Sequence, residues 1–124
     1  MSPRSTEYLA AAEARLALAR AGVTIDPAGG VGAAYFACLN AARAALSERD
    51  LNARTHGGTW GLFRQTFVLP GDVDEGLFAA AAGLQSQRER ADYAAATVPV
   101  SQAEAAIDVA ARFVAAIRTL LGVY

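Results

Sequence analysis

Alanine is the residue that most restricts what this chain can fold into. It makes up 31 of the 124 residues, a quarter of the chain. Because alanine is the best helix former and a poor strand residue, this content nearly excludes an all-β fold. Hydrophobic residues account for 54% of the chain, which supplies enough apolar surface for a buried core. We therefore expect one all-α domain over residues 1–124.

The spacing of apolar residues predicts five helices joined by short connections. They run from about Ser5 to Ala21, from an Asp26-Pro27 start (or from after Gly29-Gly30) to about Arg49, from a Thr55 cap to Val68, from Asp74 to Arg90, and from a capping box at Ser101–Glu104 to the C-terminal end. The stretch Asp92–Pro99 is expected to be non-helical. Short connections make successive helices antiparallel neighbours, so the expected architecture is an up-and-down bundle.

A few large side chains must provide most of the packing, because each alanine buries little area. These anchors are Tyr35, Phe36, Trp60, Phe63, Phe67, Phe78 and Phe113. An alanine-rich bundle gains further burial when two copies associate, so we also expect a homodimer.

Charge and rare residues exclude several kinds of function. All 11 basic residues are arginine and the net charge is −1, so no overall positive field attracts nucleic acid, although a local arginine cluster can still do so. One cysteine, Cys38, excludes an internal disulfide and a cysteine-rich zinc site, and we expect it to be a small buried hydrophobe. One histidine, His56, excludes sites that need two imidazoles from one chain. We expect no metal and no cofactor.

The N-terminal residues lack the apolar core of a signal peptide. The chain also has no uncharged stretch of about 18 apolar residues that could span a membrane. We therefore expect a cytoplasmic protein without a membrane partner.

Three clusters of residues stand out along the chain. They are AYFACLNAAR from Ala34 to Arg43, RTHGG from Arg54 to Gly58, and RERADY from Arg88 to Tyr93. In this order and spacing the clusters resemble the HEPN family, specifically its prokaryotic branch of small five-helix proteins. The resemblance covers roughly Val31 to Leu121. It implies a helical bundle, usually dimeric, that is often encoded beside a minimal nucleotidyltransferase in a toxin–antitoxin or defence pair. Many relatives are metal-independent ribonucleases.

The chain departs from the family pattern at four places. Ala33, Phe36 and Asn40 stand where the family often has arginine, tyrosine and histidine. Ribonuclease members also carry an arginine followed after four to six residues by a histidine near the end of the fourth helix. The corresponding stretch here contains Asp92 and no histidine, which disfavours the ribonuclease function.

Metal-independent RNA cleavage needs a base, a cation for the charge on phosphorus, and an acid. The candidates are Arg88 for the phosphate, Asp92 as a base or as a group that orients Arg88, Tyr93 as a donor, and His56 for proton transfer. Each also has an ordinary structural interpretation. Arg88 and Asp92 can form a helix salt bridge, His56 can belong to a turn and cap, and Tyr93 can simply pack its ring.

Three functions remain open at this level. The chain can be a dimeric component of a toxin–antitoxin or defence pair with a nucleotidyltransferase, a metal-independent ribonuclease, or a bundle that binds a nucleotide or another small ligand without catalysis. Arg43, Arg54 and Arg90 are the candidates for a groove that contacts RNA or a protein partner. In relatives a tyrosine near the last motif can be nucleotidylylated, and Tyr93 is the nearest candidate here. Whether the chain is an enzyme stays open.

Overall fold

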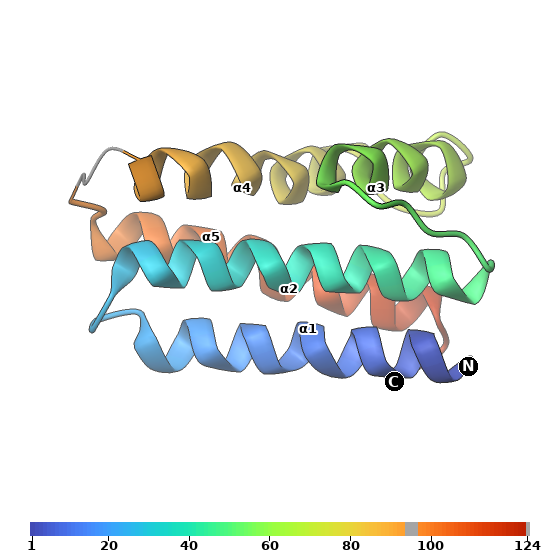
Figure 1. The fold of residues 1–124 in the computed structure, drawn as a ribbon, viewed down its shortest axis with the longest axis horizontal. Coiled ribbons are helices and arrows are strands. Elements are labelled where there is room, and N and C mark those ends of the chain that lie inside the picture. Colours follow the sequence, from blue (N-terminus) through green and yellow to red (C-terminus); the bar gives the residue numbers. More distant parts are fainter. Residues whose placement is uncertain (94–96, 124) are drawn as a thin grey trace.

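The computed structural model describes residues 1–93 and 97–123, and this part of the chain contains helices and no strand. The helices are α1 (Pro3–Gly22), α2 (Pro27–Glu48), α3 (His56–Phe63), α4 (Glu75–Tyr93) and α5 (Val100–Leu120), with a π-helical turn η1 (Arg64–Val68) that continues α3. Figure 1 shows α1 on one side, α2 and α5 in the middle, and α3 and α4 on the other side. The predicted all-α fold class is confirmed.

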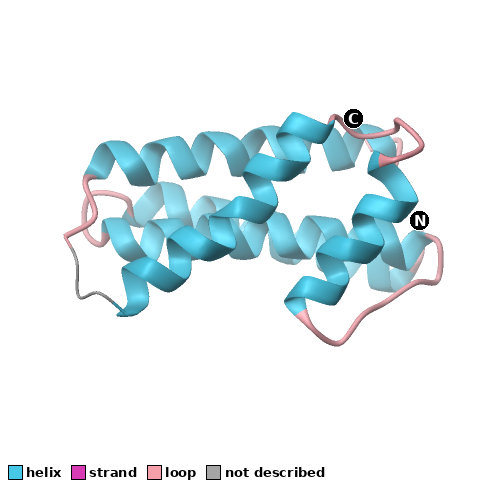
Figure 2. Cartoon of the chain, turned by 90° about the horizontal axis from the view of Figure 1, so that it is seen from above, coloured by secondary structure: helices cyan, strands magenta, loops and turns pink. Residues whose placement is uncertain are grey.

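Helix α2 is the centre of the bundle, in contact with α1, α3, α4 and α5. Twelve of its 22 residues are buried, and seven of these are alanine or glycine. A helix that is apolar on most faces is stable only when other helices cover it. The small side chains let those helices approach closely. Figure 2 shows α4 and the α3–η1 segment running obliquely across the layer beneath them.

Local capping residues fix where two of the central helices begin. The Asp26 carboxylate accepts the amide of Gly29 at 3.0 Å, which confirms the Asp26-Pro27 start of α2 over a start after Gly29-Gly30. The Thr55 hydroxyl accepts the amide of Gly58 at 2.9 Å, so α3 begins at His56 as predicted. Each bond satisfies one of the amides that a helix leaves free at its start.

Helix α5 begins differently from its prediction. It starts at Val100, and Pro99 precedes it as the cap residue without a side-chain hydrogen bond. The amide of Gln102 already donates to the Pro99 carbonyl at 3.1 Å. Ser101 therefore lies inside the first turn, and the predicted capping box of Ser101 and Glu104 is wrong.

Helix α4 is longer than predicted. It continues to Tyr93 rather than ending at Arg90, so the non-helical interpretation is wrong for Asp92 and Tyr93. Nothing in the sequence from 91 to 93 breaks a helix, and the Arg88–Asp92 ion pair joins residues one turn apart. Residues 94–96 of the predicted non-helical stretch lie outside the described residues.

The end of α3 was expected to be regular helix, but its last five residues form η1. The amide of Leu69 donates to the Arg64 carbonyl, five residues earlier, at 2.9 Å. The Thr66 hydroxyl donates to the Leu62 carbonyl at 2.8 Å, an alternative bond that loosens regular helical pairing. With this wider turn Phe67 and Val68 are both buried.

An aromatic core joins α3, α4 and α5. The Trp60 ring packs edge-on against Phe78 and Phe113, with ring centroids 6.1 and 5.8 Å apart. Phe63 is fully buried and stacks on Phe78 at 6.1 Å. The predicted anchors Trp60, Phe63 and Phe113 are confirmed as core residues, and Phe78 is partly buried against them. The same core holds α3 and α4 beside α2, where the candidate site is formed.

Candidate functional site

The hydroxyl of Tyr35 is the centre of a polar network between α2, α3 and α4. Trp60 Nε1 donates to this hydroxyl at 3.2 Å, His56 Nδ1 lies 3.1 Å from it, and Gln85 Oε1 lies 3.5 Å from it. The Tyr35 side chain is fully buried, whereas His56 is half-buried at the surface. We call the six residues Tyr35, Phe36, His56, Trp60, Gln85 and Arg88 the Tyr35 cluster.

Helical spacing explains why these side chains meet. The Thr55 cap makes His56 the first residue of α3, and Trp60 follows one turn later on the same face. Gln85 and Arg88 are three residues apart on α4 and also share a face. Both faces lie against the segment of α2 that carries Tyr35 and Phe36, because the aromatic core holds α3 and α4 there.

The Phe36 ring contacts both the His56 imidazole and the Arg88 guanidinium. The His56 ring meets the Phe36 ring edge-on at 6.0 Å, and the Arg88 guanidinium lies 4.8 Å from the centroid of the Phe36 ring. A guanidinium over an aromatic face gains about 0.5–1 kcal/mol at partly exposed sites. Arg88 also pairs with Asp92 at 3.6 Å. The cation and the imidazole therefore border the same aromatic side chain.

Burial and charge set the protonation states of the cluster. Burial lowers the pKa of His56, and the positive charges of Arg43 and Arg88 lower it further, while Glu89 opposes this effect. Burial raises the pKa of Tyr35, against the Trp60 hydrogen bond and the same two arginines. At neutral pH the imidazole is therefore neutral and the phenol keeps its proton. The nearby arginines favour an anionic ligand.

The structure brings together two of the four predicted catalytic residues. His56 and Arg88 both border Phe36. Asp92 joins only through its ion pair with Arg88, which confirms the predicted helix salt bridge. The side chain of Tyr93 is 91% exposed at the end of α4 and takes no part in the cluster. Its predicted role as a donor stays a prediction.

The three arginines that were candidates for a groove also differ in their position relative to the cluster. Arg43 is half-buried on α2, close enough to His56 for its charge to lower the imidazole pKa. Arg54 and Arg90 are exposed. Of these three arginines, Arg43 is the one whose charge shifts the pKa of His56 and of Tyr35.

Sequence reasoning missed the functional place of Tyr35, Trp60 and Gln85. Tyr35 and Trp60 were predicted as core anchors, which is correct, but their polar atoms bond to each other and to the site. The four-residue spacing of His56 and Trp60 was a usable signal, since it places both on one face of α3. Gln85 has no distinguishing local pattern.

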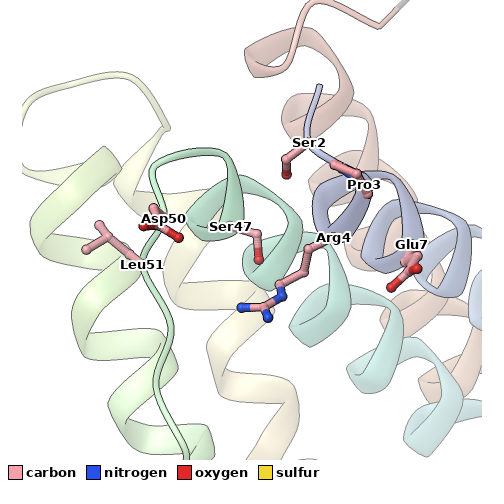
Figure 3. Close-up of a pocket in the computed structure, with 7 residues that line it drawn as sticks. All are labelled: Ser2, Pro3, Arg4, Glu7, Ser47, Asp50 and Leu51. Atoms are coloured by element: carbon pink, nitrogen blue, oxygen red, sulfur yellow. The ribbon is translucent and has the colours of Figure 1, made fainter.

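A hollow of about 410 Å³ lies elsewhere, between the start of α1 and the end of α2. Figure 3 shows the side chains that line it, which are Ser2, Pro3, Arg4, Glu7, Ser47, Asp50 and Leu51. The lining contains one arginine and two carboxylates, so the hollow has no consistent charge. It shares no lining residue with the Tyr35 cluster.

Several further observations concern the class of site. Within residues 1–93 and 97–123, no group of three or more His, Cys, Asp or Glu side chains is arranged to hold a metal ion. Burial raises the pKa of the Cys38 thiol to about 12, so it stays protonated, which confirms its interpretation as a small buried hydrophobe. None of the helices in the described ranges combines the length and the apolar character needed to cross a membrane.

Comparison of the chain with protein-family models and with curated proteins finds no match in either case.

Proposed function

We propose that this chain is a HEPN-like protein that cleaves RNA without a metal ion, with the Tyr35 cluster as its active site. The observation that supports the proposal is that His56 and Arg88 border the same ring of Phe36. The RERADY motif lacks the histidine expected of a ribonuclease, but α3 supplies an imidazole that borders the same Phe36 ring as the first arginine of the motif. Proton transfer and phosphate binding can therefore occur in one place.

The chemistry needs only groups that the chain provides and water. His56 accepts the proton of the ribose 2′-hydroxyl while its oxygen attacks phosphorus. The bond from phosphorus to the 5′-oxygen then breaks, and that oxygen takes a proton from water or from the His56 imidazolium. Arg88 and Arg43 stabilise the negative charge that develops on the phosphate oxygens. The products are a 2′,3′-cyclic phosphate and a 5′-hydroxyl.

The test is incubation of purified protein with single-stranded RNA in the presence of a chelator. We expect cleavage that leaves 2′,3′-cyclic phosphate ends. His56→Asn should lower the rate by about 10²–10⁴-fold, the usual contribution of a general acid or base. Arg88→Ala should also lower it. Arg112→Ala is the matched control, because Arg112 is an exposed arginine of α5 that also pairs with a carboxylate four residues away. Intact RNA with the wild-type protein, or equal rates for wild type and His56→Asn, would exclude this function.

A second candidate function is a dimeric component of a pair with a minimal nucleotidyltransferase. It is favoured by the exposure of Tyr93, whose side chain is 91% exposed at the end of α4 and leaves the ring open to a second enzyme. In this function the partner transfers a nucleotidyl group to the Tyr93 hydroxyl.

Co-expression with a nucleotidyltransferase encoded next to this chain tests the second candidate. Intact-mass measurement should show the added mass of a nucleotide on the wild type and on Tyr8→Phe, and no added mass on Tyr93→Phe. Tyr8 is a suitable control because it is a half-buried tyrosine of α1. An unmodified wild-type chain that also fails to co-purify with its neighbour would contradict this function.

A further inference from the structure

The orientation of the Gln85 amide is fixed by Glu89. Gln85 Nε2 donates to Glu89 Oε1 at 3.3 Å. An ionised carboxylate can only accept hydrogen bonds, so the nitrogen of the amide must face Glu89. The amide oxygen then faces Tyr35, where Oε1 lies 3.5 Å from the hydroxyl. Gln85 therefore presents only an acceptor to Tyr35.

The other two partners of the Tyr35 hydroxyl can now be assigned. Trp60 Nε1 is a donor only, so it occupies one lone pair of the hydroxyl oxygen. The single hydroxyl proton can go either to Gln85 Oε1 or to an unprotonated His56 Nδ1, and only the first choice makes all three contacts hydrogen bonds. The 3.1 Å contact with His56 is then a hydrogen bond only when Nδ1 carries a proton and donates to the tyrosine oxygen. If Tyr35 donated to His56 instead, the contact with Gln85 would hold no hydrogen bond.

We propose that Gln85, acting through the Tyr35 hydroxyl, holds neutral His56 in the tautomer with its proton on Nδ1 and a free lone pair on Nε2. Gln85 and Tyr35 are thus positioning residues. Their consequence for catalysis rests on the proposed function, because a free Nε2 is what a base for the ribose hydroxyl requires. Among the described residues, Nδ1 is the ring nitrogen with a hydrogen-bond contact in the protein.

The charged groups around the imidazole are compatible with this arrangement. Burial, together with Arg43 on α2 and Arg88 on α4, lowers the pKa of His56 and keeps it neutral, while Glu89 on α4 acts in the opposite direction. The Tyr35 phenol keeps its proton because burial raises its pKa. When Nε2 accepts a proton, Nδ1 continues to donate to Tyr35. None of the three bonds has to reverse, so proton uptake requires little reorganisation of the site.

The tautomer can be measured without RNA. His56 is the only histidine, so labelling histidine with nitrogen-15 gives two ring signals that need no further assignment. At a pH above the His56 pKa, we expect the wild type to show a protonated Nδ1 and an unprotonated Nε2. In Gln85→Leu the Tyr35 proton has no glutamine acceptor and turns to His56, so the imidazole proton should move to Nε2.

Two further variants make the test specific. Gln85→Glu keeps an acceptor oxygen for Tyr35, so it should retain the Nδ1 proton while the added negative charge raises the His56 pKa. Gln87→Leu is the matched control on α4, and it should leave both nitrogen signals unchanged. Circular dichroism checks that each variant keeps its helix content.

The outcomes separate this inference from the proposed function. A wild-type imidazole protonated on Nε2, or a Gln85→Leu variant with an unchanged tautomer, would overturn the inference. RNA that stays intact, together with the expected tautomer shift, would reject the ribonuclease and leave the positioning role supported. If both hold, Gln85→Leu should also lower the cleavage rate, and Gln85→Glu should move the acidic limb of the rate profile to higher pH.

Discussion

At the scale of single residues, the site depends on polar atoms of side chains that otherwise belong to the core. Tyr35 and Trp60 are both buried, yet each directs a polar atom to the same point. A buried hydroxyl or indole N–H costs about 1–3 kcal/mol when it lacks a partner, so the two groups stabilise each other. Packing and chemistry are therefore coupled at Tyr35.

The lowered pKa of His56 predicts how stability changes with pH. The unfolded chain binds a proton at His56 near the ordinary pKa of about 6.5, whereas the folded chain binds it at lower pH. This contribution to stability is complete above about pH 6.5 and is lost as the pH falls through the lowered pKa. His56→Asn should remove this part of the pH dependence.

Urea unfolding of wild type and His56→Asn between pH 5 and pH 8 provides the measurement. The difference in the free energy of unfolding between the two proteins should change as the pH falls below about 6.5 and should be constant above it. A difference that stays constant over the whole range would contradict the shifted pKa.

The network at Tyr35 could not be predicted from the sequence. His56 and Gln85 lie 21 and 50 residues from Tyr35 along the chain. Their meeting depends on how α3 and α4 cross α2, and periodicity within one helix carries no information about that crossing. The sequence nevertheless indicates Arg88 and His56 as candidates, because both belong to short local motifs.

At the scale of helices, local capping chemistry predicts the starts of α2 and α3 but not the start of α5. Asp26 and Thr55 cap the helices that follow them, because capping needs only a side chain and an amide three residues later. The π-helical turn at the end of α3 was not predicted. It depends on burying Phe67 and Val68 together, which is a property of the assembled core.

Glycines inside the helices predict a matched pair of stability changes. A Cβ at Gly83 of α4 would meet nothing within 4 Å, so Gly83→Ala should raise the free energy of unfolding by up to about 1 kcal/mol. A Cβ at Gly58 of α3 would lie 2.7 Å from the Thr55 hydroxyl oxygen. Gly58→Ala should therefore disturb the cap and give no such gain.

Thermal and urea unfolding of the two variants measure this difference. Gly61→Ala is a second test, because a Cβ at this exposed position of α3 is also free of contacts. Equal stabilisation by Gly58→Ala and Gly83→Ala would show that the Thr55 cap leaves room for a Cβ at position 58.

At the scale of the whole molecule, the other helices pack around one central helix, α2. α2 contacts four other helices and also bears Tyr35 and Phe36, so the site lies on the most constrained element. The alanine content predicted the all-α class correctly, because helix propensity summed over many residues is a strong signal. It did not indicate that α2 would be central, since that depends on which faces the other helices leave uncovered.

We expect the molecule to be a homodimer, because alanine-rich helices bury little area in one copy. Two large apolar side chains near the turn between α1 and α2, Leu18 and Ile25, are 56% and 86% exposed. Sedimentation analysis at micromolar concentration should give the mass of two chains. The mass of a single chain at every concentration would contradict this expectation. The variant Ile25→Ser would then have the same mass as the wild type.

The bond from Trp60 to Tyr35 gives the chain a built-in optical reporter. Trp60 is the only tryptophan, and its indole N–H donates to the Tyr35 hydroxyl oxygen. The same oxygen contacts Nδ1 of His56, the only histidine. Emission near the red edge of the protein spectrum therefore comes from one ring, two hydrogen bonds from the imidazole. Titrating the emission of the unmodified protein with acid, or with a nucleotide anion, should follow the occupancy of this site without any added dye.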